Sequence, residues 1–161
     1  EAIEHTQSSS FSCDLKKWMQ IAEGYEKGQH AYHTTLPTDA LLRLRDVMLE
    51  TREYGFAKVR EEQIVLGTQV RELLQSRGFP SVAAEGFKSP GVVVSYTTDA
   101  EIQSGRAFIK VGLQTASGVP LQCDEGPDFQ TFRLGLFGLE KWHNVERTVG
   151  HLRKALDDIG V

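Results

Sequence analysis

The sequence has little cysteine and no long apolar run. Its 161 residues include two cysteines, Cys13 and Cys123, which lie far apart and form no CxxC or zinc-ligand pattern. A disulfide framework and a structural metal are therefore not indicated, and both thiols are expected to be buried or incidental. No apolar run approaches the roughly 18 to 20 residues that cross a bilayer, and the opening EAIEHTQSSS has neither segment of a secretion signal. We therefore predict a cytoplasmic protein with no membrane partner.

Charge of one sign is never concentrated in this chain. There are 18 Lys and Arg against 22 Asp and Glu, a formal net charge of -4, and no block of like charges, so nucleic acid is not expected as a partner. The phosphate-binding motifs GxxxxGK[ST] and GxGxxG and the nucleophile elbow GxSxG are also absent. Nucleotide-binding and nucleophilic hydrolase hypotheses thus lose their main support. The length and the 40% hydrophobic content suit one globular domain, or one domain plus part of another.

The first half of the chain is predicted to be helical. Apolar residues recur at three- and four-residue steps over 14–26, 37–53 and 56–77, and glycines stand after each stretch. Pro37 suits the first turn of the second helix, which either Thr35 or Thr38 can cap. Its expected buried face contains Leu41, Leu44, Val47 and Met48. The second and third stretches are either consecutive helices or one long helix bent near Gly55.

After Pro80 the sequence pattern changes to short segments rich in Val, Ile, Phe, Tyr and Thr. These predict strands within 81–85, 91–97, 107–115 and 131–138, with a short helix over 98–105. A last helix follows, with Asn144 as N-cap and Gly160 as C-cap. The order predicts an α+β fold, with an antiparallel or mixed sheet covered by helices on one side, and argues against Rossmann-type winding.

Two groups of residues before the second helix suggest binding chemistry. Tyr32 and Thr35, with neighbouring hydroxyls, lie where a helix N-terminus offers free backbone N–H groups, so they could bind a phosphate or carboxylate. Simple capping of the helix explains the same pattern. His30 and His33 form an HxxH, but no third ligand accompanies them, so no metal is predicted.

Arg133 lies within the apolar segment TFRLGLFG. A buried cation needs a partner, so Arg133 either pairs with an internal carboxylate or awaits an acidic ligand that it would bind bidentately. The carboxylates of Asp124, Glu125 and Asp128 surround a Gly-Pro turn, which favours a solvated loop over an acid/base or cation site. Glycines flank the neighbouring strands and permit either tight turns or close approach of a ligand; they are Gly112, Gly118, Gly135 and Gly138.

Four segments together resemble a known family. The runs FSCDLKKWMQIAEGY, AYHTTLPTDALLRLRDVM, TFRLGLFG and NVERTVGHLRKAL, in that order, resemble the C-terminal part of class V pyridoxal-phosphate aminotransferases of the alanine–glyoxylate and serine–glyoxylate group. The resemblance implies a fold-type I transaminase. It further implies that residues 1–37 end the large cofactor-binding domain and that residues 38–161 form the C-terminal small domain.

The resemblance also implies roles for individual residues. Tyr32 and Thr35 match the motif that holds the phosphate of pyridoxal 5'-phosphate in the neighbouring subunit of a homodimer, with His33-Thr34 in place of the usual His-His. Arg133 matches the arginine that binds the substrate carboxylate, with Leu134 in place of Ile. The implied reaction moves an amino group from a small amino acid, such as alanine or serine, to a keto acid, glyoxylate or pyruvate.

Part of the family's machinery has no counterpart in this sequence. The motif of the lysine that forms a Schiff base with the cofactor is missing, as are the aspartate and the aromatic residue that contact the cofactor ring. The resemblance therefore implies a C-terminal fragment that is inactive by itself and does not bind the cofactor. Two alternatives stay open. The first is another class V enzyme, of the desulfurase or lyase type, although the LQCDE context of Cys123 does not resemble that of a desulfurase. The second is a stand-alone α+β module that binds an acidic ligand through Arg133.

Overall fold

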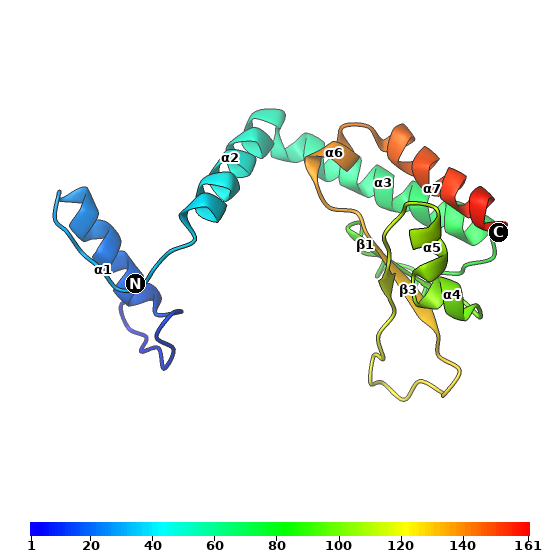
Figure 1. Cartoon of the computed structure of the whole chain (residues 1–161), viewed down its shortest axis with the longest axis horizontal. Helices are drawn as coiled ribbons and strands as arrows, with labels where there is room; N and C mark the ends of the chain where they lie inside the picture. Colours follow the sequence, from blue (N-terminus) through cyan, green and yellow to red (C-terminus); the bar gives the residue numbers. More distant parts are fainter. The chain divides into compact units, whose positions relative to one another are not determined.

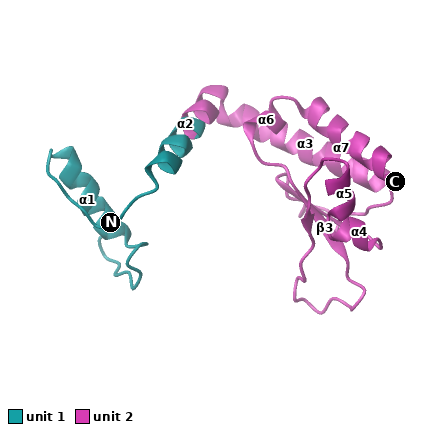
Figure 2. Ribbon diagram, viewed as in Figure 1, with its two compact units in different colours: residues 1–47 teal, residues 48–161 magenta.

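Seven helices and three short strands follow one another along the chain in the computed structural model, which describes residues 1–161. Residues 1–47 and 48–161 form separate compact units (Figure 2). The division predicted between residues 37 and 38 concerns the domains of a longer protein, so it stays a prediction.

The first unit is built around helix α1, Leu15–Glu26. The Asp14 carboxylate caps this helix by accepting a hydrogen bond of 3.0 Å from the backbone N–H of Lys17. Ile21 and Gly24 are its buried residues, and Gly24 lies close to Ala31 in the returning loop. The helix predicted over 14–26 is thus confirmed, with Asp14 as its N-cap.

The two following helices are separate, and Gly55 divides them. Helix α2 covers Thr38–Tyr54 and helix α3 covers Phe56–Ser76, while Gly55 adopts φ 104°, which L side chains rarely tolerate. Buried residues of α3 include Leu66, Val70 and Leu74, whereas α2 has none. The expected buried face of α2 is therefore wrong, because its large apolar side chains are exposed, namely Leu41, Leu42, Leu44, Val47, Met48 and Leu49.

The second unit contains a three-stranded antiparallel sheet. Its strands are β1 (Val92–Tyr96), β2 (Ala116–Ser117) and β3 (Thr131–Gly135), and they lie in the order β1-β3-β2. In the register, Arg133 of β3 lies between Val94 of β1 and Ala116 of β2. The predicted α+β fold is confirmed, and the sheet is antiparallel.

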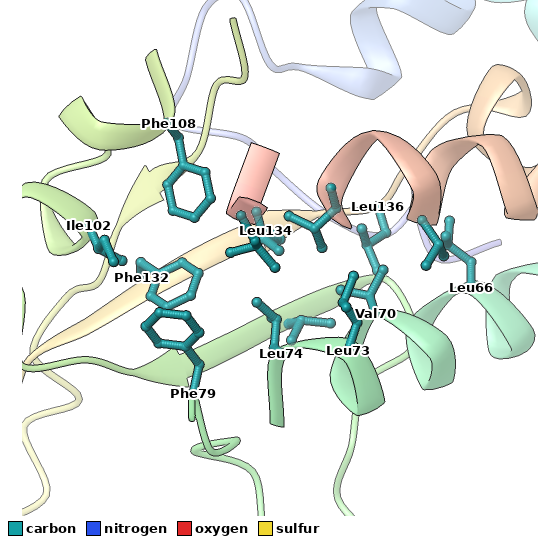
Figure 3. Close-up of a cluster of buried hydrophobic side chains, with 14 residues drawn as sticks. Leu66, Val70, Leu73, Leu74, Phe79, Ile102, Phe108, Phe132, Leu134 and Leu136 are labelled. Carbon is teal, nitrogen blue, oxygen red and sulfur yellow. The ribbon is translucent and has the colours of Figure 1, made fainter. Parts of the chain in front are cut away.

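Helices cover one face of this sheet. Helix α3 lies beside the last helix, α7 (Val145–Ile159) (Figure 1). The shorter helices are α4 (Ala100–Gln103), α5 (Arg106–Lys110) and α6 (Leu139–Trp142). As predicted, the Asn144 side chain caps α7 and Gly160, in the left-handed conformation, ends it. The core lies between helices and sheet, with the fully buried ring of Phe132 5.4 Å from that of Phe79 and 5.6 Å from that of Phe108 (Figure 3).

Two predicted strands are wrong. Residues 107–115 lie mostly in α5 and the turn after it, because Gly105, at φ 78°, redirects the chain and a helical turn then brings Phe108 into the core. The density of aromatic and β-branched residues there reflects burial and not strand structure. Within 81–85, no strand forms: Ser81 makes an isolated bridge to Ser95, and the Val82 N–H donates to the Val94 carbonyl at 3.0 Å.

Several further features bear on function. No helix of the structure is both long and apolar enough to cross a bilayer, and no three His, Cys, Asp or Glu side chains come together as metal ligands. Cys13 and Cys123 are free and exposed, so of the two expectations for these thiols, buried or incidental, burial does not hold.

Candidate functional site

Arg133 occupies the centre of the sheet face that the helices leave open. Successive side chains of a strand point to opposite faces, and Phe132 and Leu134 belong to the core. Arg133 therefore projects from the other face, where Ala116 and Gly135 are exposed. Strand β3 thus presents a half-buried cation on a surface of small and apolar residues.

The guanidinium of Arg133 has one hydrogen-bond partner and no counter-ion. Its Nε donates to the backbone carbonyl of Ser117 at 2.9 Å, and Arg133 takes part in none of the ion pairs of the structure. Of the two explanations for an arginine in this strand, the internal carboxylate partner is therefore excluded. Both Nη groups remain available, and a guanidinium can meet a carboxylate with two parallel N–H···O bonds.

Glu125, one of the acidic residues near Arg133 in sequence, has another role. The Glu125 carboxylate accepts hydrogen bonds from the backbone N–H groups of Gln122, at 2.9 Å, and Cys123, at 2.8 Å. These backbone bonds lower the pKa of Glu125 to about 2. Glu125 therefore stabilises the turn at 122–125, within the loop between β2 and β3 that extends away from α3 and α7 (Figure 1). Its contacts agree with the solvated loop that the sequence predicts.

Tyr32 and Thr35 lie together in the first unit, in the loop before α2. The Tyr32 hydroxyl is 3.4 Å from Thr35 Oγ1, both residues are exposed, and 69% of Tyr32 is accessible. Because the Thr35 hydroxyl faces Tyr32 and α2 begins at Thr38, the Thr35 side chain does not cap that helix. Two adjacent exposed hydroxyls can donate hydrogen bonds to one anionic group.

His33 fixes the shape of this loop. Its Nε2 donates to the carbonyl of Phe11 at 2.9 Å, and its ring lies 4.2 Å from the Phe11 ring and 5.2 Å from that of Trp18. His30 instead contacts Tyr25, so the two histidines of the HxxH are engaged separately. The loop that carries Tyr32 and Thr35 is thereby tied to the segment before α1.

The structure adds Ser117 and Gly118 to the candidate residues. The Ser117 carbonyl is the protein partner of Arg133, and Gly118 places that carbonyl by pairing its N–H with the Thr131 carbonyl at 2.8 Å. The sequence marked Gly118 only as one of several glycines that flank the strands. A backbone carbonyl leaves no trace in the residue type of Ser117, so this contact could not be read from the sequence.

Comparison with known proteins shows the fold. The sequence matches no protein-family model, and no curated protein matches it in sequence. Among solved structures it is similar to alanine–glyoxylate aminotransferase from Nostoc sp., with a TM-score of 0.69 and 19% identity over 96% of this chain and 39% of that one. It is also similar to ureidoglycine–glyoxylate aminotransferase from Bacillus subtilis, with a TM-score of 0.68 and 19% identity over 99% of this chain and 40% of that one. A third is an aspartate aminotransferase of subgroup IV from Thermus thermophilus, with a TM-score of 0.63 and 20% identity over 98% of this chain and 42% of that one.

These likenesses define the class of fold. The chain has the fold of the C-terminal part of aminotransferase structures, as its sequence motifs predict, and it spans about two fifths of their length. At 19–20% identity, this similarity demonstrates a shared fold.

Proposed function

We propose that this chain is the C-terminal part of a pyridoxal-phosphate-dependent transaminase, which moves an amino group from a small amino acid, such as alanine or serine, to glyoxylate or pyruvate. The observation that carries the proposal is Arg133, a cation without a counter-ion on the open face of a sheet, in a fold that aminotransferases share. The activity belongs to a longer protein, because the chain spans about two fifths of the structures that it matches.

In this proposal, Arg133 binds and orients the carboxylate of the amino acid and of the keto acid. Two parallel hydrogen bonds from a planar guanidinium fix both the position and the plane of a carboxylate. Holding the reacting carbon in one orientation reduces the entropy lost in the reaction step. The half-buried position of Arg133 strengthens the interaction relative to a fully solvated pair.

Tyr32 and Thr35 would hold the phosphate of the cofactor, across the interface of a homodimer. Their chemistry fits that group, because both hydroxyls are exposed, lie 3.4 Å apart and can donate to phosphate oxygens. Pyridoxal phosphate, when bound, supplies the electron sink for amino-group transfer. The contacts of His33 with Phe11 and Trp18 would keep the two hydroxyls together before the cofactor arrives.

The replacement Arg133→Lys in the full-length enzyme tests this proposal. Lysine keeps the charge but cannot form the planar pair of bonds, so we expect kcat/KM to fall by about a hundredfold or more, equivalent to about 3 kcal/mol. Fold and cofactor content should be retained. Arg106→Lys is the matched control, because the exposed Arg106 pairs with Glu101 and a lysine preserves that ion pair.

Two outcomes would contradict the proposal. If Arg133→Lys unfolds the protein while the remaining folded enzyme is fully active, Arg133 has a structural role only. If the full-length protein binds small carboxylates through Arg133 but transfers no amino group, it is a binding module and not a transaminase.

A further inference from the structure

The orientation of the Arg133 guanidinium depends on one backbone carbonyl. A guanidinium carries five N–H donors in a fixed plane, and the bond from Nε to the Ser117 carbonyl, 2.9 Å long, uses one of them. With Nε held, the side chain cannot swing freely, and the two Nη groups keep a defined position. The location of the Ser117 carbonyl therefore controls where a carboxylate could be bound.

Strand β2, which provides that carbonyl, is weakly anchored. It contains only Ala116 and Ser117, and it pairs with β3 on one side alone. The next bond along the chain joins the Gly118 N–H to the Thr131 carbonyl at 2.8 Å. Beyond it, the chain leaves the sheet for the long loop that leads to β3. Gly118 is thus the last anchor between Ser117 and this loop.

Gly118 approaches β3 more closely than any other residue type could. A Cβ atom built on Gly118 would lie 1.7 Å from Thr131 Oγ1 and 2.4 Å from the Thr131 carbonyl oxygen. Thr131 is 2% exposed and belongs to the central strand, so it has little room to move. Any side chain at position 118 must therefore displace the end of β2, and with it the Ser117 carbonyl.

We infer that Gly118 is a positioning residue for the carboxylate of the substrate. It acts through Ser117, whose carbonyl orients Arg133, and it touches no substrate itself. The inference rests on the proposed function, because it assumes that Arg133 binds an α-carboxylate. It adds that the close contact of β2 with β3 tunes the affinity for that carboxylate.

The test compares Gly118→Ala with Gly126→Ala in the full-length enzyme. A Cβ on Gly126, in the same loop, meets nothing within 4 Å, so this variant is the matched control. For Gly118→Ala we expect the KM values of both the amino acid and the keto acid to rise tenfold or more. The value of kcat should stay within about threefold, and the cofactor content should be unchanged. Gly126→Ala should change each parameter by less than twofold.

A double variant shows whether Gly118 acts through Arg133. When Arg133 is already lysine, adding Gly118→Ala should change KM by less than threefold, because the orientation that it disturbs has been lost. A further tenfold increase would overturn the inference, since Gly118 would then act elsewhere. Unchanged KM values in the single variant would also overturn it, even if Arg133→Lys raises KM. If Arg133→Lys leaves kcat/KM unchanged, the proposed function itself fails.

A second variant decides the matter if Gly118→Ala does not fold. Ser117→Gly adds no atoms but loosens the backbone at the carbonyl that holds Arg133. We expect it to raise KM at least threefold with kcat retained. A folded Ser117→Gly enzyme with the KM of the unmodified enzyme would overturn the inference.

Discussion

Replacing Phe132 by leucine should separate the stability of the second unit from the chemistry on its open face. Phe132 is fully buried and contacts the rings of Phe79 and Phe108, while its neighbour Arg133 points to the opposite face of the sheet. Each aromatic pair contributes about 0.5–1.5 kcal/mol beyond the area that it buries. Leucine also fills the site less well, at a cost of about 1 kcal/mol. The free energy of unfolding should therefore fall by roughly 2–4 kcal/mol.

Urea denaturation of the 161-residue chain measures this loss. Trp142 packs against the same core, so its fluorescence reports on the second unit once Trp18 is replaced by phenylalanine in every protein compared. With a urea dependence of about 2 kcal/mol per molar, the midpoint should fall by roughly 1–2 M. Phe87→Leu is the control, because Phe87 is 83% exposed and the same substitution there should shift stability by less than about 0.5 kcal/mol. Equal midpoints for Phe132→Leu and Phe87→Leu would refute the reasoning.

Three further predictions concern the loop, the hydroxyl pair and the isolated chain. The pKa of Glu125 is lowered from its ordinary 4.5 to about 2, so its contribution to the order of the turn at 122–125 is complete above pH 4.5 and disappears as the pH falls through about 2. A carboxyl NMR titration should show this low midpoint, and a midpoint near 4.5 would contradict the prediction. The variant Glu125→Gln should show faster amide exchange at Gln122 and Cys123. In the full-length enzyme, the double variant Tyr32→Phe, Thr35→Ala should raise the dissociation constant of pyridoxal phosphate about tenfold or more, because hydrogen bonds to charged groups contribute about 1.5–3 kcal/mol each. An absorbance titration measures this constant, and an unchanged value would exclude the phosphate role. The 161-residue chain by itself should yield no stoichiometric borohydride-reducible cofactor adduct on one lysine, and mass spectrometry detecting such an adduct would overturn this expectation.

Elements with local signals could be predicted from the sequence. Helices α1, α3 and α7 combine apolar residues at helical spacing with caps or glycine stops, such as Asp14, Asn144 and Gly160. Strands β1 and β3 are short apolar runs next to turn residues. In each case the residues that determine the element lie within one or two turns of it, so no knowledge of the rest of the chain is needed. Arg133 was identifiable for a related reason, since a cation in an apolar strand requires a partner.

Features that depend on distant residues could not be predicted in this way. The run around Phe108 has the composition of a strand, but its burial in the core as part of α5 involves Phe132, far along the chain. The sequence also left open whether Arg133 pairs with an internal carboxylate, because Glu125 lies near it in sequence yet bonds to its own loop. The tertiary structure alone brings Gly118 against Thr131 and the Ser117 carbonyl to Arg133. Local periodicity and capping thus determined most helices of this protein, whereas pairing between strands determined the environment of its candidate substrate-binding residue.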